Sequence, residues 1–231
     1  MRTIGLIGGM SWESSAEYYR IVNRETQRRL GGTHSAPIVL FSFDFAEIEA
    51  LQEAGDWDSA AARLVAAART LEAAGAELLV ICTNTMHRLA PEVEAATAVP
   101  LLHIADATAT AVRRDGVGTV GLLGTRYTME EDFYRGRLEA NHGLEVLVPG
   151  PEQREAVHRV IYEELCRGSV RDESRQEYQR IVGDLAGRGA EGVILGCTEI
   201  GLLLRPQDAE VPLFDTAQIH AEEAARYSLT A

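Results

Sequence analysis

The sequence predicts an α/β protein made of two similar parallel-sheet subdomains related by internal duplication. Three observations predict this fold class. Apolar segments of strand length alternate with helical segments along the chain, which is typical of α/β folds. The strand segments are continuous apolar runs, as expected of parallel strands that are covered on both faces. The two halves of the chain also share short sequence matches in the same order.

The first half of the chain begins with a strand and a long helix. Residues 2–10 (RTIGLIGGM) are predicted to form a strand that ends in a glycine turn. Residues 11–32 are predicted to form a helix, because Ser11 or Ser14 can cap its start and a double glycine ends it. The alternation then continues with strands at 36–45, 77–82 and 99–104 and helices at 56–74 and 105–114.

The second half of the chain alternates in the same way. Its first strand, residues 118–124 (GTVGLLG), has the apolar and glycine pattern of the first strand of the chain. A closing helix is expected at residues 216–228. Between them the sequence predicts strands at 144–148, 192–196 and 211–215 and helices at 128–140, 151–167 and 172–187.

Three matches between the halves indicate an internal duplication, since all lie at nearly the same offset of 112 to 116 residues. One such match can arise by chance, but three in the same order are not expected to. We therefore predict a first subdomain of residues 1–104 plus 208–231 and a second subdomain of residues 105–207. The matches are IGLIG (4–8) with VGLLG (120–124), GAELLVICTNT (75–85) with GAEGVILGCTE (189–199), and VPLLHIADA (99–107) with VPLFDTAQI (211–219).

Composition and charge argue against several classes of protein. The formal net charge of −13 disfavours binding to nucleic acid or to anionic membranes. No run of about 18 apolar residues is present. The first residues do not resemble a signal peptide, so we expect a cytoplasmic protein. The three cysteines include no CxxC pair and no zinc-ligand spacing, which argues against a disulfide framework and a metal site.

Small polar residues follow the predicted strands, at the edge of a parallel sheet where ligands bind. If the two subdomains face each other, these residues line one cleft from both sides. The second sequence match aligns Cys197 with Thr83, and Gly196 with Cys82. Because neighbouring strand residues point to opposite faces, we expect Cys197 and Thr83 to face the cleft and Cys82 to point away from it.

Five motifs carry a resemblance to a known family. GLIGGMSWESSAEYY, CTNTMH, LLGTRYTM, IYEEL and GCTEIGLL occur in this order. Together they resemble the aspartate/glutamate racemases, which are cofactor-independent amino-acid racemases, and in particular bacterial members that also act on other amino acids. The resemblance implies an active site between two α/β subdomains, an amino-acid substrate, no cofactor and a homodimer. It also implies a pair of cysteines, one from each half, that face the substrate α-carbon from opposite sides.

The chain departs from this pattern at Thr83, since the family has a cysteine directly before Asn84-Thr85. Only the second cysteine, Cys197, is kept. A cysteine thiol has a pKa of about 8.5 and can serve as a base near neutral pH, whereas a threonine hydroxyl cannot. We therefore expect Cys197, as a thiolate, to remove the α-proton. Thr83, or a water that it holds, would return a proton on the other face. The resemblance implies a preference for L-substrates, here L-aspartate and L-glutamate.

Eight further residues are candidates for substrate binding. Asn84, Thr85 and Thr198 match family positions that hold the α-carboxylate. Gln52 matches a position that contacts the substrate side chain, and a neutral glutamine there leaves broader amino-acid racemisation open. Glu199 could bind the substrate ammonium or orient the thiol. The full set is Met10, Ser11, Gln52, Asn84, Thr85, Thr125, Thr198 and Glu199.

These residues also have purely structural interpretations. The hydroxyl and amide side chains could simply cap helices, and Glu199 could be an acid in the first turn of a helix. His87 and His103 are expected to be structural, although either could support the site from behind. Arg126, in the motif GTRYT, could bind a substrate side-chain carboxylate.

Three other functions compete with a racemase. A one-cysteine decarboxylase or isomerase of the same superfamily would use a similar cleft. A non-catalytic amino-acid-binding protein would explain the missing cysteine, but it would not need to keep Cys197. A nucleotide-binding module is disfavoured, because GLIGGMS does not have the GxGxxG spacing.

Overall fold

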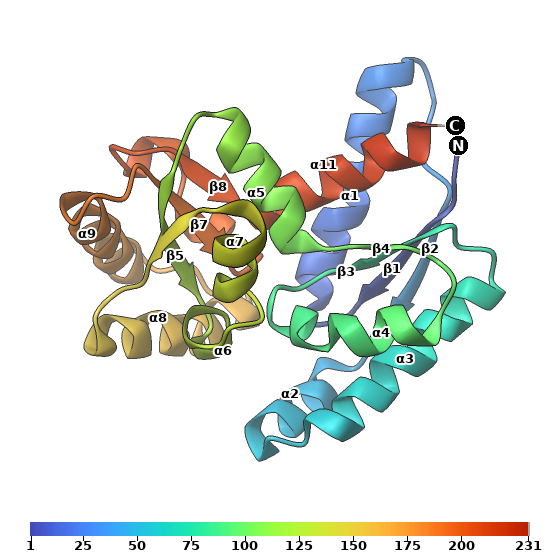
Figure 1. The fold of residues 1–231 in the computed structure, drawn as a ribbon, viewed down its shortest axis with the longest axis horizontal. Coiled ribbons are helices and arrows are strands. Elements are labelled where there is room, and N and C mark those ends of the chain that lie inside the picture. The colour runs from blue at the N-terminus through green and yellow to red at the C-terminus, as the bar shows by residue number, and fades with distance from the viewer. Residues whose placement is uncertain (231) are drawn as a thin grey trace. The chain divides into compact units, whose positions relative to one another are not determined.

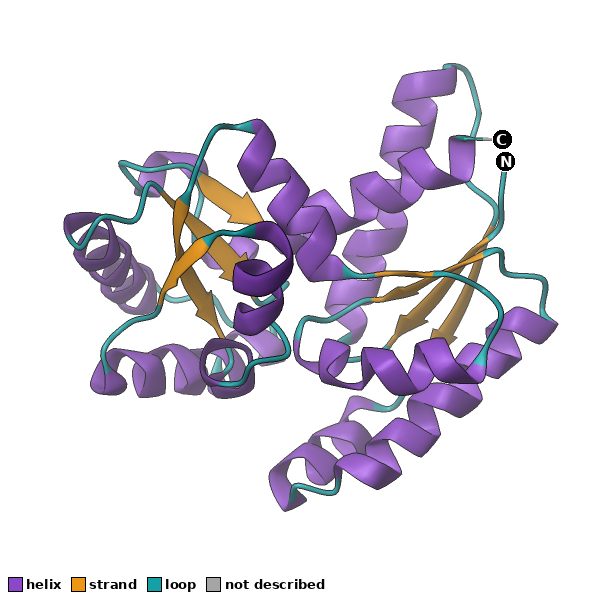
Figure 2. Ribbon diagram, in the orientation of Figure 1, coloured by secondary structure: helices purple, strands orange, loops and turns teal. Residues whose placement is uncertain are grey.

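The computed structural model describes residues 1–230, and this part of the chain forms two compact units. The first unit comprises Met1–His103 and the C-terminal segment from His220, and the second comprises Ile104–Ile219. Each unit contains one four-stranded parallel sheet flanked by helices (Figure 2). Each also has its own cluster of buried apolar side chains. The predicted fold class, an α/β protein with two similar parallel-sheet subdomains, is confirmed.

The first unit is built around a parallel sheet with helices on both faces. Its strands are β1 (Ile4–Gly8), β2 (Ile38–Ser42), β3 (Leu78–Ile81) and β4 (Leu101–Leu102), in the spatial order β2-β1-β3-β4. Its helices are α1 (Trp12–Leu30), α2 (Phe45–Ala54), α3 (Trp57–Ala73), the 3-10 helix η1 (Thr85–Leu89) and α4 (Ala90–Ala96). Within this unit α1 covers one face of the sheet, and α3 and α4 cover the other (Figure 1).

The second unit repeats this plan. Its strands are β5 (Thr119–Gly124), β6 (Glu145–Leu147), β7 (Gly192–Gly196) and β8 (Leu213–Asp215), in the order β6-β5-β7-β8. Its helices are α5 (Ile104–Arg114), α6 (Arg126–Glu130), α7 (Arg135–His142), α8 (Pro151–Glu163), η2 (Leu165–Arg167), α9 (Asp172–Gly187), α10 (Ile200–Leu203) and η3 (Pro206–Asp208). The last helix, α11 (Thr216–Leu229), begins in the second unit and continues from His220 in the first.

The two sheets are equivalent strand by strand. Ile81 of β3 pairs with Ile7 of β1, and Leu195 of β7 pairs with Leu123 of β5. Ile7 and Leu123 each stand directly before the final glycine of their strand. Thr83 stands two residues beyond the first pair, and Cys197 stands two residues beyond the second. The register therefore gives Thr83 and Cys197 equivalent places in their own units, as the sequence match indicates.

Helix α2 is absent from the sequence-based prediction, which extends the second strand to residue 45. Asp44 stops that strand, because its side chain accepts a hydrogen bond from the N–H of Ala46 at 3.2 Å and caps the helix. Gly55 ends the helix in the left-handed conformation, with φ +68°. Both signals are in the sequence. The short helices η1, α4 and α10 were also not predicted.

The single helix predicted at 128–140 is in fact two helices, α6 and α7. The hydroxyl of Thr125 accepts a hydrogen bond from the N–H of Thr128 at 3.4 Å, so α6 begins before residue 128. The backbone becomes extended at Glu131, where α6 ends. Apolar spacing continues across this break, and periodicity alone therefore joins the two helices.

The sequence predicts that every strand is covered on both faces of its sheet, but this holds only for some of the strands. β1, β3 and β7 are buried along their whole length. β2 lies at an edge of its sheet, and its side chains are partly open, with Leu40 44% exposed. Side chains of an edge strand have neighbouring strands on one side only, so fewer atoms cover them.

Candidate active site

The clearest group of reactive side chains lies at the end of β7. The thiol of Cys197 donates a hydrogen bond to Oε2 of Glu199 at 3.0 Å, and the hydroxyl of Thr198 donates to the same oxygen at 2.7 Å. Cys197 is only 8% exposed and Glu199 only 3%. Three consecutive residues thus direct a thiol and a hydroxyl at one buried carboxylate.

The end of β7 can take this form because the strand finishes in a glycine. A Cβ atom at Gly196 would stand 2.8 Å from the carbonyl oxygen of Leu123, so only glycine allows β5 and β7 to lie this close. Directly afterwards, the N–H of Ile200 bonds to the carbonyl of Cys197 at 3.1 Å. This tight turn brings the side chains of Cys197 and Glu199 together.

The surroundings of Cys197 favour its protonated form. Burial raises the pKa of the thiol well above its ordinary value, and the negative charge of Glu199 raises it further. The backbone N–H of Glu199 bonds to the sulfur and lowers the thiol pKa, but this effect is weaker. Two adjacent buried anions repel each other strongly, so the pair carries one negative charge. At neutral pH the proton is on sulfur, from which it is donated to Oε2 of Glu199.

Two further buried polar side chains of the second unit were not among the predicted site residues. Glu164 accepts a hydrogen bond from the hydroxyl of Ser174 at 2.7 Å. Tyr178 donates to a backbone carbonyl of α8 at 2.9 Å. Burial raises the pKa of Tyr178, and the nearby acidic groups of Cys197, Glu177 and Glu164 add to this rise. The motif IYEEL was a signal for Glu164, whereas nothing in the sequence marked Tyr178.

The end of β3 presents a hydroxyl instead of a thiol. Thr83 is half-buried, and its backbone is held on both sides. The hydroxyl of Ser14 donates to the carbonyl of Cys82 at 3.2 Å, and Nδ1 of His87 bonds to the carbonyl of Thr83 at 2.7 Å. The position of the Thr83 backbone is therefore set by side chains from α1 and η1.

The residues after Thr83 form a buried polar segment with Gln52. Asn84 and Thr85 are both buried, and Thr85 begins η1. Gln52 of α2 is buried as well, and its Nε2 donates to the sulfur of Met86 at 3.0 Å. The predicted side-chain contact, Gln52, thus bonds to the residue directly after Thr85, and two of the three predicted carboxylate-binding residues, Asn84 and Thr85, lie in the same unit as Gln52.

The loop after β1 holds Met10 and Ser11 against the same unit. A Cβ atom at Gly9, which has φ +81°, would collide with the backbone of Phe43, so this turn requires glycine. Met10 is buried. The side chain of Ser11 caps α1 by accepting from the N–H of Ser14 at 3.3 Å. Ser11 therefore has the structural role that the sequence offers as an alternative.

Thr125 and Arg126 follow β5 in the second unit. Thr125 is buried and caps α6, so it also has a structural role. Arg126 is exposed, and its guanidinium lies over the ring of Tyr127 at 5.5 Å from the centroid. Its backbone N–H donates to Nδ1 of His158 at 3.2 Å. Arg126 thus contacts side chains of α6 and α8.

The other two cysteines have different surroundings. Cys82 is buried, and its sulfur lies 3.8 Å from the carbonyl oxygen of Val80. Burial raises its pKa, with no charged neighbour contributing. Cys166 is partly buried against the core of the second unit. Cys197 differs from Cys82 in that its thiol contacts a carboxylate.

The candidate residues therefore fall into two groups at the carboxyl ends of two equivalent sheets. Met10, Ser11, Gln52, Thr83, Asn84 and Thr85 belong to the first unit, and Thr125, Cys197, Thr198 and Glu199 belong to the second. A family model described as Asp/Glu/Hydantoin racemase matches residues 7–224. The chain belongs to this racemase family. Its enzymatic class is that of an amino-acid racemase.

Individual relatives agree with the assignment to the racemases. A crystal structure of a Yersinia pestis protein assigned as an Asp/Glu racemase is 56% identical, covers 100% of both chains and has a TM-score of 0.93. An aspartate racemase homologue from Pyrococcus horikoshii OT3 is 36% identical, covers 99% of both chains and has a TM-score of 0.85. The broad specificity amino-acid racemase RacX of Bacillus subtilis (strain 168) is 25% identical over 162 residues, which are 70% of this chain and 69% of that protein.

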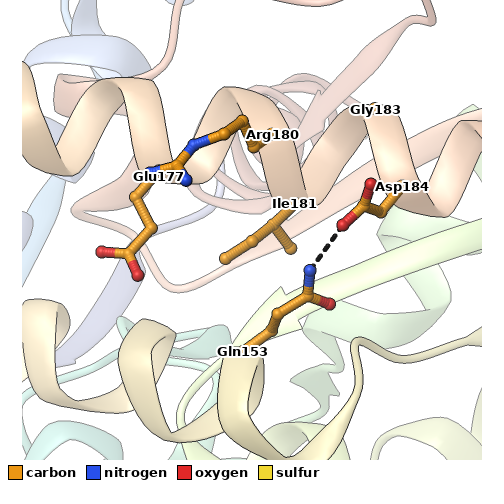
Figure 3. Close-up of a pocket in the computed structure, with 6 residues that line it drawn as sticks. All are labelled: Gln153, Glu177, Arg180, Ile181, Gly183 and Asp184. Atoms are coloured by element: carbon orange, nitrogen blue, oxygen red, sulfur yellow. Dashed lines mark hydrogen bonds between the residues drawn. The ribbon is translucent and has the colours of Figure 1, made fainter.

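A surface pocket of about 300 Å³ lies elsewhere on the second unit of the racemase, between α8 and α9 (Figure 3). Gln153 and Asp184 lie at the pocket and share a hydrogen bond of 2.6 Å, and the other lining residues are Glu177, Arg180, Ile181 and Gly183. None of the candidate site residues lines this pocket, and we assign it no role.

Two kinds of feature are not found in the part of the racemase that the structure describes. No helix within residues 1–230 is long and apolar enough to cross a membrane. No group of three or more His, Cys, Asp or Glu side chains in the same range is arranged to hold a metal ion.

Proposed function

We propose that this enzyme racemises L-aspartate and L-glutamate without a cofactor, with Cys197 as the base and Thr83 on the side that returns the proton. The observation that carries the proposal is the contact between the thiol of Cys197 and the carboxylate of Glu199. This pair supplies one buried base, while Thr83 supplies a hydroxyl at the equivalent place in the first unit. The Asp/Glu description of the family and of the Yersinia pestis relative supports acidic substrates.

Proton removal starts at the end of β7. The thiol proton of Cys197 passes to Glu199, and the resulting thiolate takes the α-proton of the L-amino acid. The electron pair of the broken C–H bond stays on the α-carbon and spreads into the α-carboxylate. Throughout this step Cys197 and Glu199 share a single negative charge until the substrate proton arrives, so two adjacent buried anions never form.

The carbanion requires hydrogen-bond donors at the α-carboxylate. The hydroxyl, amide and backbone N–H groups of Asn84, Thr85 and Thr198 are proposed to supply them. Met10, Ser11 and Thr125 are proposed to complete the lining of the site. Because η1 has five residues and α10 has four, individual donors rather than long helix dipoles must carry this stabilisation.

Proton return is assigned to Thr83, or to a water bound to its hydroxyl, on the face of the α-carbon opposite Cys197. The oxygen that gives up this proton regains one from solvent, and the Cys197–Glu199 pair releases the α-proton to solvent. A threonine hydroxyl donates a proton to a strongly basic carbanion, but it cannot remove an α-proton near neutral pH without a neighbouring base. The enzyme is therefore expected to exchange the α-proton of L-substrates much faster than that of D-substrates.

Gln52 is proposed to contact the substrate side chain. Its amide donates to the sulfur of Met86, which is a weak acceptor, so a substrate carboxylate can replace that contact at little cost. An amide also binds uncharged polar groups. Side chains other than those of aspartate and glutamate are then accepted too, in line with the broad specificity of the Bacillus subtilis relative.

The test measures α-proton exchange and inversion separately. L-aspartate, L-glutamate, their D-enantiomers and a panel of neutral amino acids are incubated with the enzyme in D₂O, one at a time. Proton NMR follows loss of the α-proton signal, and chiral chromatography follows inversion. We expect exchange with inversion, fastest from an L-acid. Cys197→Ala should abolish both, while Cys166→Ala, a matched control at another thiol, should keep both. Inversion by Cys197→Ala at the wild-type rate would contradict the proposal. Light scattering on the same sample tests the expected homodimer.

A further inference from the structure

Three buried histidines from distant parts of the chain meet inside the first unit. His87 belongs to η1, His103 follows β4, and His220 belongs to α11. The ring centroid of His87 lies 4.6 Å from that of His103 and 5.6 Å from that of His220. Buried polar rings need hydrogen-bond partners, so the partners of each ring indicate what the cluster does.

One member of the cluster, His220, is neutral and fixed in orientation. Nε2 of His220 bonds to the carbonyl of Leu102 at 2.9 Å, and since a carbonyl only accepts, this nitrogen carries the proton. Nδ1 then accepts from the hydroxyl of Tyr18 at 2.8 Å. Burial lowers the pKa of His220 to about 4, so the ring is uncharged at neutral pH. The ring of His87 packs against this fixed neighbour.

His87 bonds to the backbone that carries the proposed proton donor. Its Nδ1–H donates to the carbonyl of Thr83 at 2.7 Å. In a regular α-helix that carbonyl would accept from the backbone N–H of residue 87. Here η1 is a 3-10 helix, and the N–H of His87 bonds instead to the carbonyl of Asn84 at 3.0 Å. The imidazole of His87 therefore donates to the carbonyl that would accept a backbone N–H if η1 were an α-helix.

We propose that His87 is a positioning residue that holds Thr83 in place for proton return. This inference rests on the proposed function of Thr83. Ser14 fixes the carbonyl of the residue before Thr83, and His87 fixes the carbonyl of Thr83 itself. With both peptide groups held, the Thr83 hydroxyl starts from one backbone orientation, and small errors in the position of a reacting group are costly in rate.

The second unit does not use this device at the equivalent strand end. At the offset of 114 residues, Gly201 stands in the place of His87. The carbonyl of Cys197 bonds to the backbone N–H of Ile200 at 3.1 Å. The histidine therefore occurs after the strand that leads to Thr83 and not after the strand that leads to Cys197. If it served only to stabilise the repeated fold, we would expect it in both units.

Removal of the ring donor should separate inversion from exchange. His87→Phe keeps an aromatic ring in the cluster but cannot donate to Thr83, whereas His87→Asn keeps an N–H close to the position of Nδ1. With L-aspartate in D₂O as the probe, His87→Phe should lower inversion by about 10- to 100-fold and change exchange by less than about threefold. His87→Asn should restore most of the inversion. An equal loss of exchange and inversion, without rescue by asparagine, would overturn the proposal. His87→Leu is a second donor-free variant in case phenylalanine does not fit.

A double-substitution cycle shows whether His87 acts through Thr83. Once Thr83→Ala has removed the hydroxyl, His87→Phe should lower inversion no further, and a further loss of about tenfold would overturn the proposal. His103→Leu disturbs the same cluster without removing the bond to Thr83, so it should change exchange and inversion by the same factor. Failure of the proposed function has a different signature, because Thr83→Ala would then invert as fast as the wild type.

Discussion

The ends of β3 and β7 occupy equivalent places in two sheets of the same strand order, yet they differ in burial, charge and hydrogen bonding. In the first unit, Thr83 is half-buried, and the ring of His87 holds its carbonyl. In the second, Cys197 is buried, and its thiol contacts the carboxylate of Glu199. One end offers a hydroxyl on a fixed backbone, and the other offers a thiol next to a proton acceptor.

The difference arises from the few residues that follow each strand. At the offset of 114 residues, Glu199 stands where the first unit has Thr85, and Gly201 stands where it has His87. Duplication fixed the position of each strand end, while substitutions in the following turn decided its chemistry. Inversion requires two groups on opposite faces of one carbon, but these groups need not be identical.

The largest effect is expected from making the two strand ends alike. Cys197→Thr leaves a hydroxyl at both ends, and a hydroxyl cannot supply an anion near neutral pH. Exchange of the α-proton of L-aspartate should therefore fall at least about 1,000-fold, as proton NMR in D₂O would measure. Exchange within tenfold of the wild type would mean that another group is the base.

A pH profile tests whether Glu199 distinguishes the second strand end. If the thiol proton passes to Glu199, exchange by the wild type is nearly constant between about pH 6 and 8, because the pair keeps one proton. Glu199→Gln removes the acceptor. Burial still raises the pKa of Cys197, so the thiolate forms only by proton loss to water, and exchange rises about tenfold per pH unit.

The control for the pH profile is Glu163→Gln, which makes the same charge change on an exposed side chain of the same unit. It should keep the flat profile. A rising profile in the wild type itself would show that the proton leaves for solvent and not for Glu199.

Acid should destabilise the first unit through His220. Burial holds the pKa of His220 at about 4, while the unfolded chain protonates this ring below about pH 6.5. The free energy of unfolding therefore keeps its full value above about pH 6.5 and falls by about 2 to 3 kcal/mol as the pH falls towards 4. His220→Gln should remove most of this loss, measured as the difference in urea unfolding between pH 7 and 4.5. An unchanged pH dependence would contradict this prediction.

The matched substitution in the second unit is His158→Gln. Burial also lowers the pKa of His158, but this ring is only half-buried, and the positive charge of Arg126 contributes to the shift. The acid-dependent part of the unfolding free energy should therefore change less than in His220→Gln.

The smallest effects concern ion pairs, and the first of these is a cluster on α1. Nε and Nη2 of Arg28 and Nε of Arg29 donate to Glu25, and the bonds from Arg28 are the main reason that the pKa of Glu25 falls to about 2. The stabilisation is present above about pH 4.5 and is lost as the pH falls towards 2. Glu25→Gln should cost about 1 kcal/mol of unfolding free energy at pH 7, since solvent reaches both arginines and screens the ion pairs.

A matched ion pair in the second unit links Arg154 to the exposed Glu130. Glu130→Gln should change the unfolding free energy by less than about 0.5 kcal/mol. Equal effects of Glu25→Gln and Glu130→Gln at pH 7 would show that the ion pairs of the buried Glu25 stabilise the protein no more than the ion pair of the exposed Glu130.

Local pattern was sufficient for most of the fold. The apolar runs predicted all eight strands found within residues 1–230, because buried parallel strands need apolar residues at nearly every position. Ser11 and the double glycine predicted the limits of α1 to within two residues. The pattern failed at α2 and at the break between α6 and α7. At α2 a single capping side chain, that of Asp44, decides where the helix begins, and between α6 and α7 the backbone becomes extended at Glu131.

The sequence by itself determined the strand order along the chain, the duplication, the family, and the pairing of Thr83 with Cys197, because each of these is recorded in local pattern or in repeated motifs. Only the tertiary structure decided the protonation of Cys197, since a thiol pKa depends on burial and on a carboxylate oxygen 3.0 Å away. It alone also decided the bond from His87 to Thr83, because the orientation of that ring depends on packing against His220, which is distant in the chain.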